Sequence, residues 1–278
     1  MLEAEPGAEF KSPWTARAED QSTTQFMVRQ QYRDFLNREP EANGLAFWTN
    51  EIDVCGVDAQ CIEVKRINVS AAFYLSSEFQ QTGYLVYRTY KAAYGNLPDA
   101  PVPIRFNEFL PDTKEISHDV IVNQPGWEQV LENNKQAFAA ELVQRGRFTA
   151  AFPATMAEAE FVDKLNNNAG NPLSEMERNQ LVSDLGAGTK TRAQILRAVA
   201  ENQKLAQTEF NRAFVLMQYF GYLRRNPNDA PDANFDGYNF WLTKLNQFNG
   251  DFVQPEMVRA FIDSSEYRRR FGTQDFVD

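Results

Sequence analysis

The sequence predicts an all-α fold, an array of tandem, diverged helical repeat units around aromatic cores. One aromatic-rich pattern between Phe26 and Phe79 returns between Gln218 and Tyr267. Apolar residues recur at the spacing of amphipathic helices, and no stretch shows the strict alternation of a strand. Turn residues and capping motifs divide the chain into short helices.

The repeated pattern consists of the same residue types at the same spacing, followed by the same short motifs. The N-terminal motif contains, in order, Gln31, Tyr32, Leu36, Arg38, Pro40, Gly44, Phe47, Trp48, Ser76, Ser77, Glu78 and Phe79. The C-terminal motif contains Gln218, Tyr219, Leu223, Arg225, Pro227, Gly237, Phe240, Trp241, Ser264, Ser265, Glu266 and Tyr267. Chance does not explain agreement at so many positions, so we interpret the two motifs as an internal repeat.

Caps and helix-breaking residues predict the helices of the first half. Thr23 or Thr24 can cap a first helix that runs to about residue 37, and it stops there because the residue before Pro40 avoids helical angles. Further helices are expected over residues 44–52 and 62–80, after Gly83 in a degenerate copy of the opening helix, and over 104–110 and 127–148.

Capping boxes mark the helices of the second half. Thr155 with Glu158 predicts a helix over 157–166, and Ser174 with Glu177 predicts one over 175–185. The remaining helices are expected to start at Thr191 and run to about residue 201, and to cover 210–225 and 238–248, with the last unit closing near Gly272.

These helices divide the chain into five expected segments. The first 22 residues are polar and contain Pro and Gly, which is typical of a tail or linker and indicates a piece of a longer protein. The expected segments are a flexible tail or linker at 1–22, a first helical repeat unit with a disulfide loop at 23–95, a connecting helical segment at 96–150, a degenerate helical unit at 151–208 and a last repeat unit at 209–278.

Composition excludes several classes of partner. With 43% hydrophobic residues among 278, the chain can bury a core and is not globally disordered. The net charge of −10 argues against nucleic acid and against an anionic membrane surface. No apolar run approaches the roughly 18 to 20 residues that cross a bilayer, so no membrane insertion is expected.

The two cysteines predict a disulfide. Cys55 and Cys61 flank a short loop that contains a glycine, a separation that a disulfide can close. Zinc is disfavoured because there is no second pair of thiols and the single histidine, His118, is distant in sequence. A reactive thiol is disfavoured because neither cysteine has a basic neighbour. A disulfide predicts an extracellular or cell-surface location.

The sharpest chemical pattern is a possible calcium loop. Asp232, Asn234 and Asp236, followed by Gly237 and the backbone carbonyl of Tyr238, match the first half of an EF-hand loop. The expected metal ligands are therefore Asp232, Asn234, Asp236 and Tyr238, and the expected cofactor is calcium. The position of the bidentate glutamate is Thr243, however. The alternative is an Asx-rich turn that begins the following helix, because it uses the same residue types.

The aromatic residues of the two motifs have two interpretations. They could form a platform on which sugars stack, but their helical spacing between turn residues is typical of the core of each helical unit, which we favour. Arg38 and Arg225 are expected to form structural ion pairs with Glu78 and Glu266 rather than to bind a ligand.

The N-terminal motif resembles the bacterial "domain of unknown function 4214" family. The resemblance is carried by Tyr32 to Pro40, Asn43-Gly44-Leu45, Phe47-Trp48 and Ser77-Glu78-Phe79. Residues 25–83 and 210–272 match the family pattern well, and the middle of the chain matches weakly and lacks the tryptophan. The family is distantly similar to phycobilisome linker polypeptides and has no catalytic residues to transfer. The resemblance implies a helical, extracellular, non-catalytic module of an exported protein.

The expected function is a non-catalytic secreted or cell-surface binding and scaffolding module whose partner is a protein or a polysaccharide. No nucleophile elbow, P-loop or zinc-protease motif occurs, and His118 lies alone in a polar stretch. The alternative is an extracellular carbohydrate-active hydrolase with a carboxylate pair, which would need two carboxyl groups about 5 to 10 Å apart in a groove.

Overall fold

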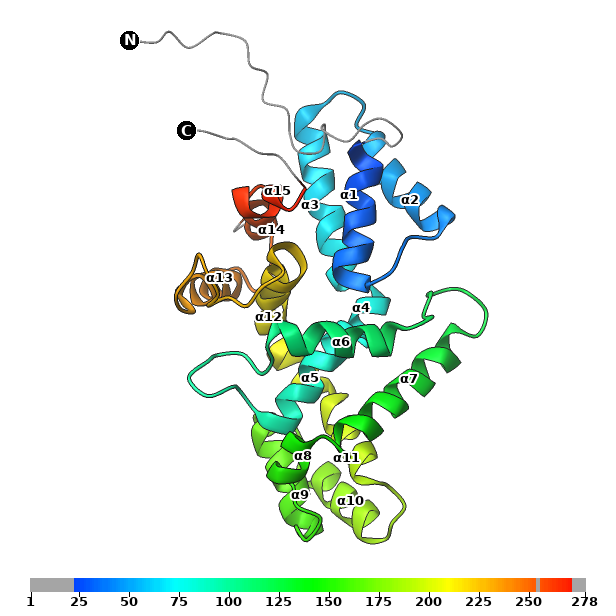
Figure 1. Ribbon diagram of the computed structural model, residues 1–278, viewed down its shortest axis with the longest axis vertical. Helices are drawn as coiled ribbons and strands as arrows, with labels where there is room; N and C mark the ends of the chain where they lie inside the picture. Colours follow the sequence, from blue (N-terminus) through cyan, green and yellow to red (C-terminus); the bar gives the residue numbers. More distant parts are fainter. Residues whose placement is uncertain (1–22, 254–255, 272–278) are drawn as a thin grey trace.

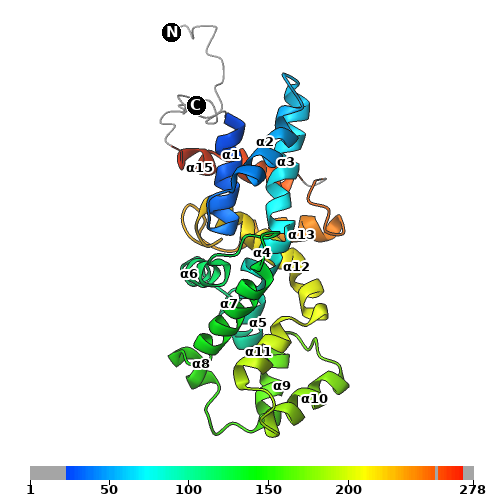
Figure 2. The same cartoon turned by 90° about the vertical axis from the view of Figure 1, so that its right-hand side faces the viewer.

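The protein was analysed as a computed structural model, which describes residues 23–253 and 256–271. These residues form helices and connecting turns without a strand, so the predicted all-α fold is confirmed. The molecule is elongated, and the first and last helices lie at the same end of it (Figures 1 and 2). The expected tail at 1–22 and the expected end near Gly272 lie outside the described residues.

The helices of the first half run from the upper end of the molecule to its centre (Figure 1). They are α1 (Thr23–Gln31), the wider π-helical turn η2 (Tyr32–Leu36), α2 (Ala42–Asp53), α3 (Ala59–Leu75), α4 (Ser77–Gln81), α5 (Gly83–Tyr94), α6 (Phe106–Ser117) and α7 (Trp127–Leu142). The second half contains α8 (Gly146–Ala151), α9 (Glu158–Asn168), α10 (Glu175–Gly186), α11 (Arg192–Ala200), α12 (Gln203–Gln218), η3 (Tyr219–Leu223), α13 (Asp236–Gln247), α14 (Met257–Ile262) and α15 (Ser265–Arg269).

Two long helices that the sequence predicts are each divided in the structure. The expected helix over 62–80 breaks at Ser76, whose backbone is extended and whose hydroxyl accepts a hydrogen bond from the Phe79 N–H at 3.1 Å. A side-chain cap of this kind begins a new helix. The expected helix over 127–148 likewise ends at Leu142 and restarts at Gly146.

Other expected helix starts or ends are also wrong, including the start of the helix expected over 210–225, which begins earlier, at Gln203 of α12. The helix expected over 104–110 continues to Ser117 through Pro111, because its turns on both sides of the proline are buried at Phe109 and Ile116. The capping box expected at Thr155 does not form, and α9 begins at Glu158 without a side-chain cap.

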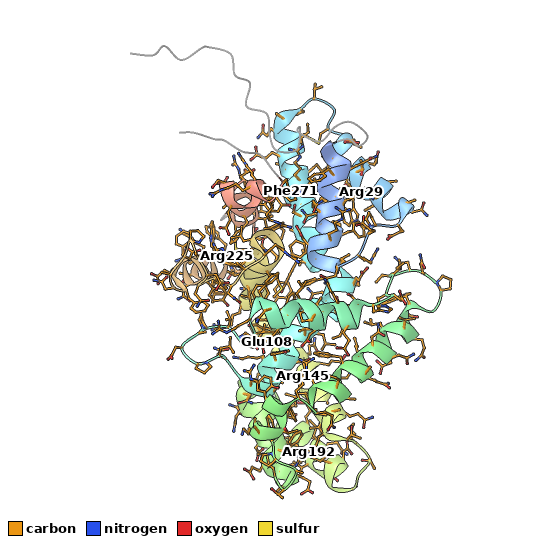
Figure 3. All side chains as sticks on the ribbon, viewed as in Figure 1. Arg29, Glu108, Arg145, Arg192, Arg225 and Phe271 are labelled. Carbon is orange, nitrogen blue, oxygen red and sulfur yellow. A yellow bond between two sulfur atoms is a disulfide. The ribbon has the colours of Figure 1, made fainter. Side chains whose placement is uncertain are left out.

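Arg192 provides the physical reason for the missing box at Thr155. Arg192 lies near the lower end of the molecule (Figure 3). Its guanidinium donates hydrogen bonds to four backbone carbonyls in the segment that precedes α9. The acceptors are the carbonyl oxygens of Phe152, Pro153, Ala154 and Met156, at 2.8 to 3.3 Å. The box at Ser174 forms as predicted, and the helix expected to start at Thr191 does so with a capping box that was not predicted.

The central helix is α5, which packs against α6, α9, α11 and α12. Its buried tyrosines find partners for their hydroxyl groups, as buried tyrosines usually do. Tyr87 donates to Glu209 at 2.7 Å and Tyr90 donates to Asp112 at 2.8 Å. Arg145 also binds Asp112 with two hydrogen bonds of 2.8 and 2.9 Å, and this joins the middle helices around α5.

The two motifs are neighbours in space although they lie at opposite ends of the sequence. The turns η2 and η3 are in contact, and α14 packs against α3 (Figure 1). The rings of Phe35 and Tyr222, which occupy the same position in the two motifs, meet edge to face with centroids 5.2 Å apart. The last helices therefore fold back onto the first ones, and the middle helices form the other end of the molecule (Figures 1 and 2).

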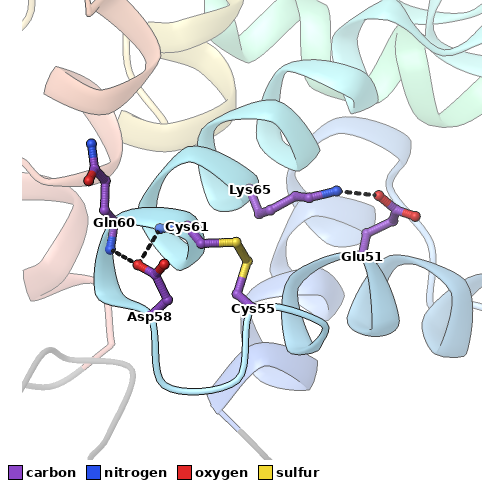
Figure 4. Close-up of a disulfide and its surroundings, with 6 residues drawn as sticks. All are labelled: Glu51, Cys55, Asp58, Gln60, Cys61 and Lys65. Atoms are coloured by element: carbon purple, nitrogen blue, oxygen red, sulfur yellow. Dashed lines mark hydrogen bonds and ion pairs between the residues drawn. A yellow bond between two sulfur atoms is a disulfide. The ribbon is translucent and has the colours of Figure 1, made fainter.

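The predicted disulfide joins Cys55 and Cys61 at the start of α3, with Cα atoms 5.6 Å apart (Figure 4). Asp58 caps α3 within this loop by accepting hydrogen bonds from the Gln60 and Cys61 N–H groups at 3.0 and 3.1 Å. The loop thus connects α2 to α3 at an exposed corner. Within residues 23–253 and 256–271, no helix has the length and apolar character that a bilayer crossing requires.

An ion pair between α7 and α11 predicts a pH effect. Two hydrogen bonds from Arg197, at 2.7 and 2.6 Å, lower the pKa of Glu132 to about 2. The folded state therefore favours the ionised carboxylate, so its contribution is present above the unfolded pKa and is lost as the pH falls toward 2. Because Glu132 is partly exposed, we expect Glu132→Gln to lower the free energy of unfolding by less than about 1 kcal/mol at pH 7. Urea denaturation should show this difference vanishing near pH 2, and a difference that persists there would contradict the assignment.

Candidate functional site

The arginine of each motif holds two carboxylates beside the turn. Arg38 donates to both carboxylate oxygens of Glu78 at 2.7 Å and to Glu41 at 2.7 Å. Arg225 donates to Glu266 at 2.6 and 3.0 Å and to Asp232 at 2.7 Å. The expected ion pairs with Glu78 and Glu266 are confirmed. Their second acidic partners, Glu41 and Asp232, were not expected.

The same backbone turn places each arginine. The residue before it, Asn37 in one motif and Arg224 in the other, has a left-handed conformation with φ of 56° and 58°. Its N–H closes the π-helical turn by bonding to the carbonyl of Tyr32 or Tyr219. Left-handed residues commonly end helices, and this reversal turns the next side chain back toward the closing Ser-Glu motif.

A tyrosine-over-glycine contact also occurs in both motifs. A Cβ atom added to Gly237 would lie 2.7 Å from the hydroxyl of Tyr219, and one added to Gly44 would overlap the hydroxyl of Tyr32 and the carboxylate of Glu41. Glycine is therefore required at both places so that α2 and α13 can approach the tyrosines closely.

Replacing Gly44 by alanine should destabilise the protein. Alanine favours a helix over glycine by about 1 kcal/mol, but overpacking costs about 1 to 3 kcal/mol, so we expect a net loss of about 1 kcal/mol in the free energy of unfolding. The matched control is Gly146→Ala in α8, where an added Cβ meets no atom within 4 Å and only the helix preference acts. Denaturant unfolding compares the two, and a Gly44→Ala protein as stable as Gly146→Ala would contradict the close contact.

The aromatic residues are only partly core residues. Tyr32, Phe79, Tyr219 and Tyr267 are buried as predicted. Phe47 and Phe240, however, are 58% and 52% exposed, so the core interpretation is wrong for them. Each lies edge to face against the tryptophan that follows it, with centroids 4.9 and 5.0 Å apart. The tryptophans in turn pack in equivalent places, Trp48 against Phe73 and Trp241 against Phe261, at 5.5 and 6.0 Å.

A pocket of about 570 Å³ opens beside the N-terminal motif. Its lining includes Phe47, Trp48, Glu41 and Glu78, together with residues 121–124 of the connection between α6 and α7. Burial raises the pKa of Glu78 and, with help from the Glu41 charge, raises the pKa of Tyr32 to about 12. The connection at 121–124 lies outside both motifs, so the sequence pattern did not indicate it.

The residues of the expected calcium loop are engaged with other groups. Asp232 pairs with Arg225, while Asn234 accepts a hydrogen bond from the Asp236 N–H at 2.9 Å and donates one to its carboxylate at 2.9 Å. The ring of Tyr238 is buried, and its hydroxyl donates to the carbonyl of Arg212 at 3.1 Å. These contacts have the form of the alternative interpretation, an Asx turn at the start of α13. Within the described residues, no group of three His, Cys, Asp or Glu side chains could hold a metal ion.

Calcium binding at this loop therefore stays a prediction, and the ion would compete with Arg225 for the Asp232 carboxylate. If the ion binds there, a chelator should lower the melting temperature and Asp236→Ala should abolish the shift. Thermal unfolding in millimolar calcium and in excess chelator measures this. Equal melting temperatures in the two solutions would remove calcium from the account.

His118 has a side chain that is 75% exposed and lies 3.2 Å from the carboxylate of Asp119, as expected for a surface histidine.

No family model, curated protein or solved structure matches this chain. The functional argument therefore rests on the geometry of the molecule itself.

Proposed function

We propose that this chain is a non-catalytic binding and scaffolding module of an exported protein, acting after secretion or at the cell surface. Its partner would be a protein or a polysaccharide. The disulfide between Cys55 and Cys61 supports an oxidising compartment. The resemblance to the "domain of unknown function 4214" family belongs to the same proposal, as does the origin of the two motifs from one duplicated helical unit.

The observation that carries this proposal is the exposed phenylalanine that both motifs keep at the same position. Phe47 and Phe240 are about half exposed, so they contribute less to folding than the buried rings do. Aromatic side chains are enriched at binding interfaces, where they supply a large, rigid contact area. The two Phe-Trp pairs therefore offer two similar contact points on the outside of the molecule.

The arginine clusters support a structural role for the nearby carboxylates. Glu41 and Glu78 both bind Arg38, and Asp232 and Glu266 both bind Arg225 in the same way. The same arrangement occurs in both motifs, and each time it joins the turn at the end of one helix to the start of a later helix. A role in stabilising the fold explains this repetition. Because Arg38 binds both Glu41 and Glu78, this pairing supports a structural role over attack on a bound sugar or its protonation.

The second candidate is a carbohydrate-active hydrolase, which one observation favours. Glu41 and Glu78 face the same pocket, and burial raises the pKa of Glu78 as it does for many general acids. This enzyme would use Glu78 as the acid and Glu41 as the second carboxylate, and Arg38 would have to release both.

One set of variants separates the two functions. The protein is sedimented with insoluble cell-wall glycans such as cellulose, chitin and peptidoglycan, and the release of reducing ends is measured in parallel. We expect the double variant Phe47→Ala/Phe240→Ala to reduce the bound fraction severalfold. The control is Met176→Ala, because Met176 is an apolar residue that is 79% exposed on α10.

Two other outcomes would change the proposal. Reducing ends released by the wild type and abolished in Glu78→Gln would establish the hydrolase. Bound fractions that are equal for the double variant and Met176→Ala would remove the Phe-Trp pairs from the proposal.

A further inference from the structure

The helices α12 and α13 pack against each other (Figure 2). A second groove, of about 630 Å³, is lined by residues of these two helices, of the end of α4 and of the start of α5, and it shares no residue with the Arg38 pocket. Its floor is apolar and includes Tyr84, Phe210 and Leu242. Its polar lining is dominated by carboxamide side chains, those of Gln80, Gln203, Gln207, Asn211, Asn246 and Asn249.

The groove is nearly uncharged although the protein is acidic. The chain has 38 acidic residues and a net charge of −10, yet no Asp or Glu is among the residues that line this groove. The single charged residue there is Arg212, and its guanidinium lies 4.0 Å from the carboxylate of Glu209. Neither an anionic nor a cationic ligand finds a strong counter-charge in the groove.

Part of the amide lining is held in place. Asn211 on α12 donates a hydrogen bond to Asn246 on α13 at 2.9 Å, which connects the two walls. After α13 the chain turns through Asn249 and Gly250, with φ of 53° and 84°, residue types that adopt left-handed conformations readily. A Cβ on Gly250 would lie 3.1 Å from the Asn211 side-chain oxygen, so glycine leaves room for this amide pair.

Other amides of the lining are available to a ligand. Gln203 and Gln207 lie four residues apart on α12, so they share one face of the helix. Their side chains are exposed, and within residues 23–253 and 256–271 they have no hydrogen bond to the protein. A carboxamide both donates and accepts hydrogen bonds, and so does a sugar hydroxyl.

We propose that this groove binds a short stretch of a neutral polysaccharide. Carboxamides of α12 and α13 would pair with the hydroxyl groups, and the apolar face of the sugar rings would pack on the aromatic and aliphatic floor. The inference rests on the proposed function, since a module that binds without cleaving needs a recognition site and no catalytic group. Beyond the proposed function, this inference names the class of ligand and a binding site that is separate from the Phe-Trp pairs.

Isothermal titration of the full chain with soluble hexasaccharides tests this. The probes are neutral gluco-, xylo- and manno-hexasaccharides, with oligogalacturonate as the anionic comparison. We expect a neutral hexasaccharide to bind more tightly than the anionic one, and Gln203→Ala/Gln207→Ala to weaken it about tenfold or more. Alanine favours the helix, so this variant should fold. The matched control is Gln247→Ala, which changes an exposed glutamine of α13 that does not line the groove.

The failures of the two proposals are distinguishable. The proposal that the groove binds a neutral polysaccharide is overturned by any of three results. They are that no neutral hexasaccharide binds at millimolar concentration, that the anionic one binds more tightly, or that the double variant binds as tightly as Gln247→Ala. In each of these cases the sedimentation result with the phenylalanine variants still stands. Cleavage of a hexasaccharide during titration would instead overturn the proposed non-catalytic function.

Discussion

Tyr222→Ala should lower the free energy of unfolding by about 4 kcal/mol, because it removes a fully buried ring from the contact between the two motifs. Tyr222 has no exposed surface. Its ring lies edge to face with Phe35 at 5.2 Å and with Tyr267 at 5.3 Å. The cavity would open between η2 and η3, which pack against each other. Denaturant unfolding followed by circular dichroism measures the loss.

The matched control is Phe240→Ala, which removes an aromatic ring of similar size that is 52% exposed. We expect that variant to lose less than about 1 kcal/mol, since surface positions generally change stability little. Tyr222→Phe keeps the ring and removes only the hydroxyl, so it separates their contributions to stability. The hydrogen bond from this hydroxyl to Gln31 is long at 3.5 Å. If Tyr222→Ala and Phe240→Ala are equally stable, the two motifs do not pack together as described.

Asp34→Asn should cost about 3 kcal/mol, because it breaks a buried ion pair between the first and last helical segments. The side chain of Asp34 is 4% exposed and accepts two hydrogen bonds from Arg270, at 2.7 and 3.0 Å. Arg270 also donates to the carbonyls of Gly221 and Tyr222 at 3.1 and 2.7 Å. Loss of the carboxylate would leave this partly buried guanidinium without its counter-charge.

The matched control is Asp163→Asn, which breaks an equally bidentate pair with Arg178 at a carboxylate that is 46% exposed. An exposed pair of this kind is screened by solvent and contributes little to stability. A double variant, Asp34→Leu/Arg270→Met, should recover most of the stability, since apolar residues of similar size can replace a buried pair. Equal losses for Asp34→Asn and Asp163→Asn in urea denaturation would show that the Asp34 pair is not buried between the segments.

Parts of the site could be predicted because the chain contains the pattern twice. Arg38 and Arg225 have the same sequence separation from a turn proline, and a Ser-Ser-Glu sequence occurs later in each motif. An ion pair between the arginine and this glutamate could therefore be inferred without coordinates. The capping box at Ser174 was also predictable, because a cap depends on residues only three apart. The box at Thr155 was not, because Arg192, far along the chain, holds the carbonyls ahead of α9.

The exposed phenylalanines show a different limit of the sequence pattern. Helical spacing places Phe47 and Trp48 in the same short helix but does not say which ring faces the core. In the structure Phe73 packs against Trp48, and Phe47 is left outside as its edge-to-face neighbour. Which of the two rings is exposed therefore depended on which helix packs against α2.

By itself the sequence determined that the chain is helical, that two distant stretches share one pattern, and that Arg38 and Arg225 form ion pairs with Glu78 and Glu266. These features depend on local spacing and on residue types that recur. Only the tertiary structure decided that the last helices fold back onto the first through Phe35, Tyr222 and the Asp34–Arg270 pair. It also decided that amides from α4, α12 and α13 and the loop after α13 line one groove. The physical reason is that contacts between residues far apart in the chain depend on how helix faces fit together, and local periodicity does not specify that fit.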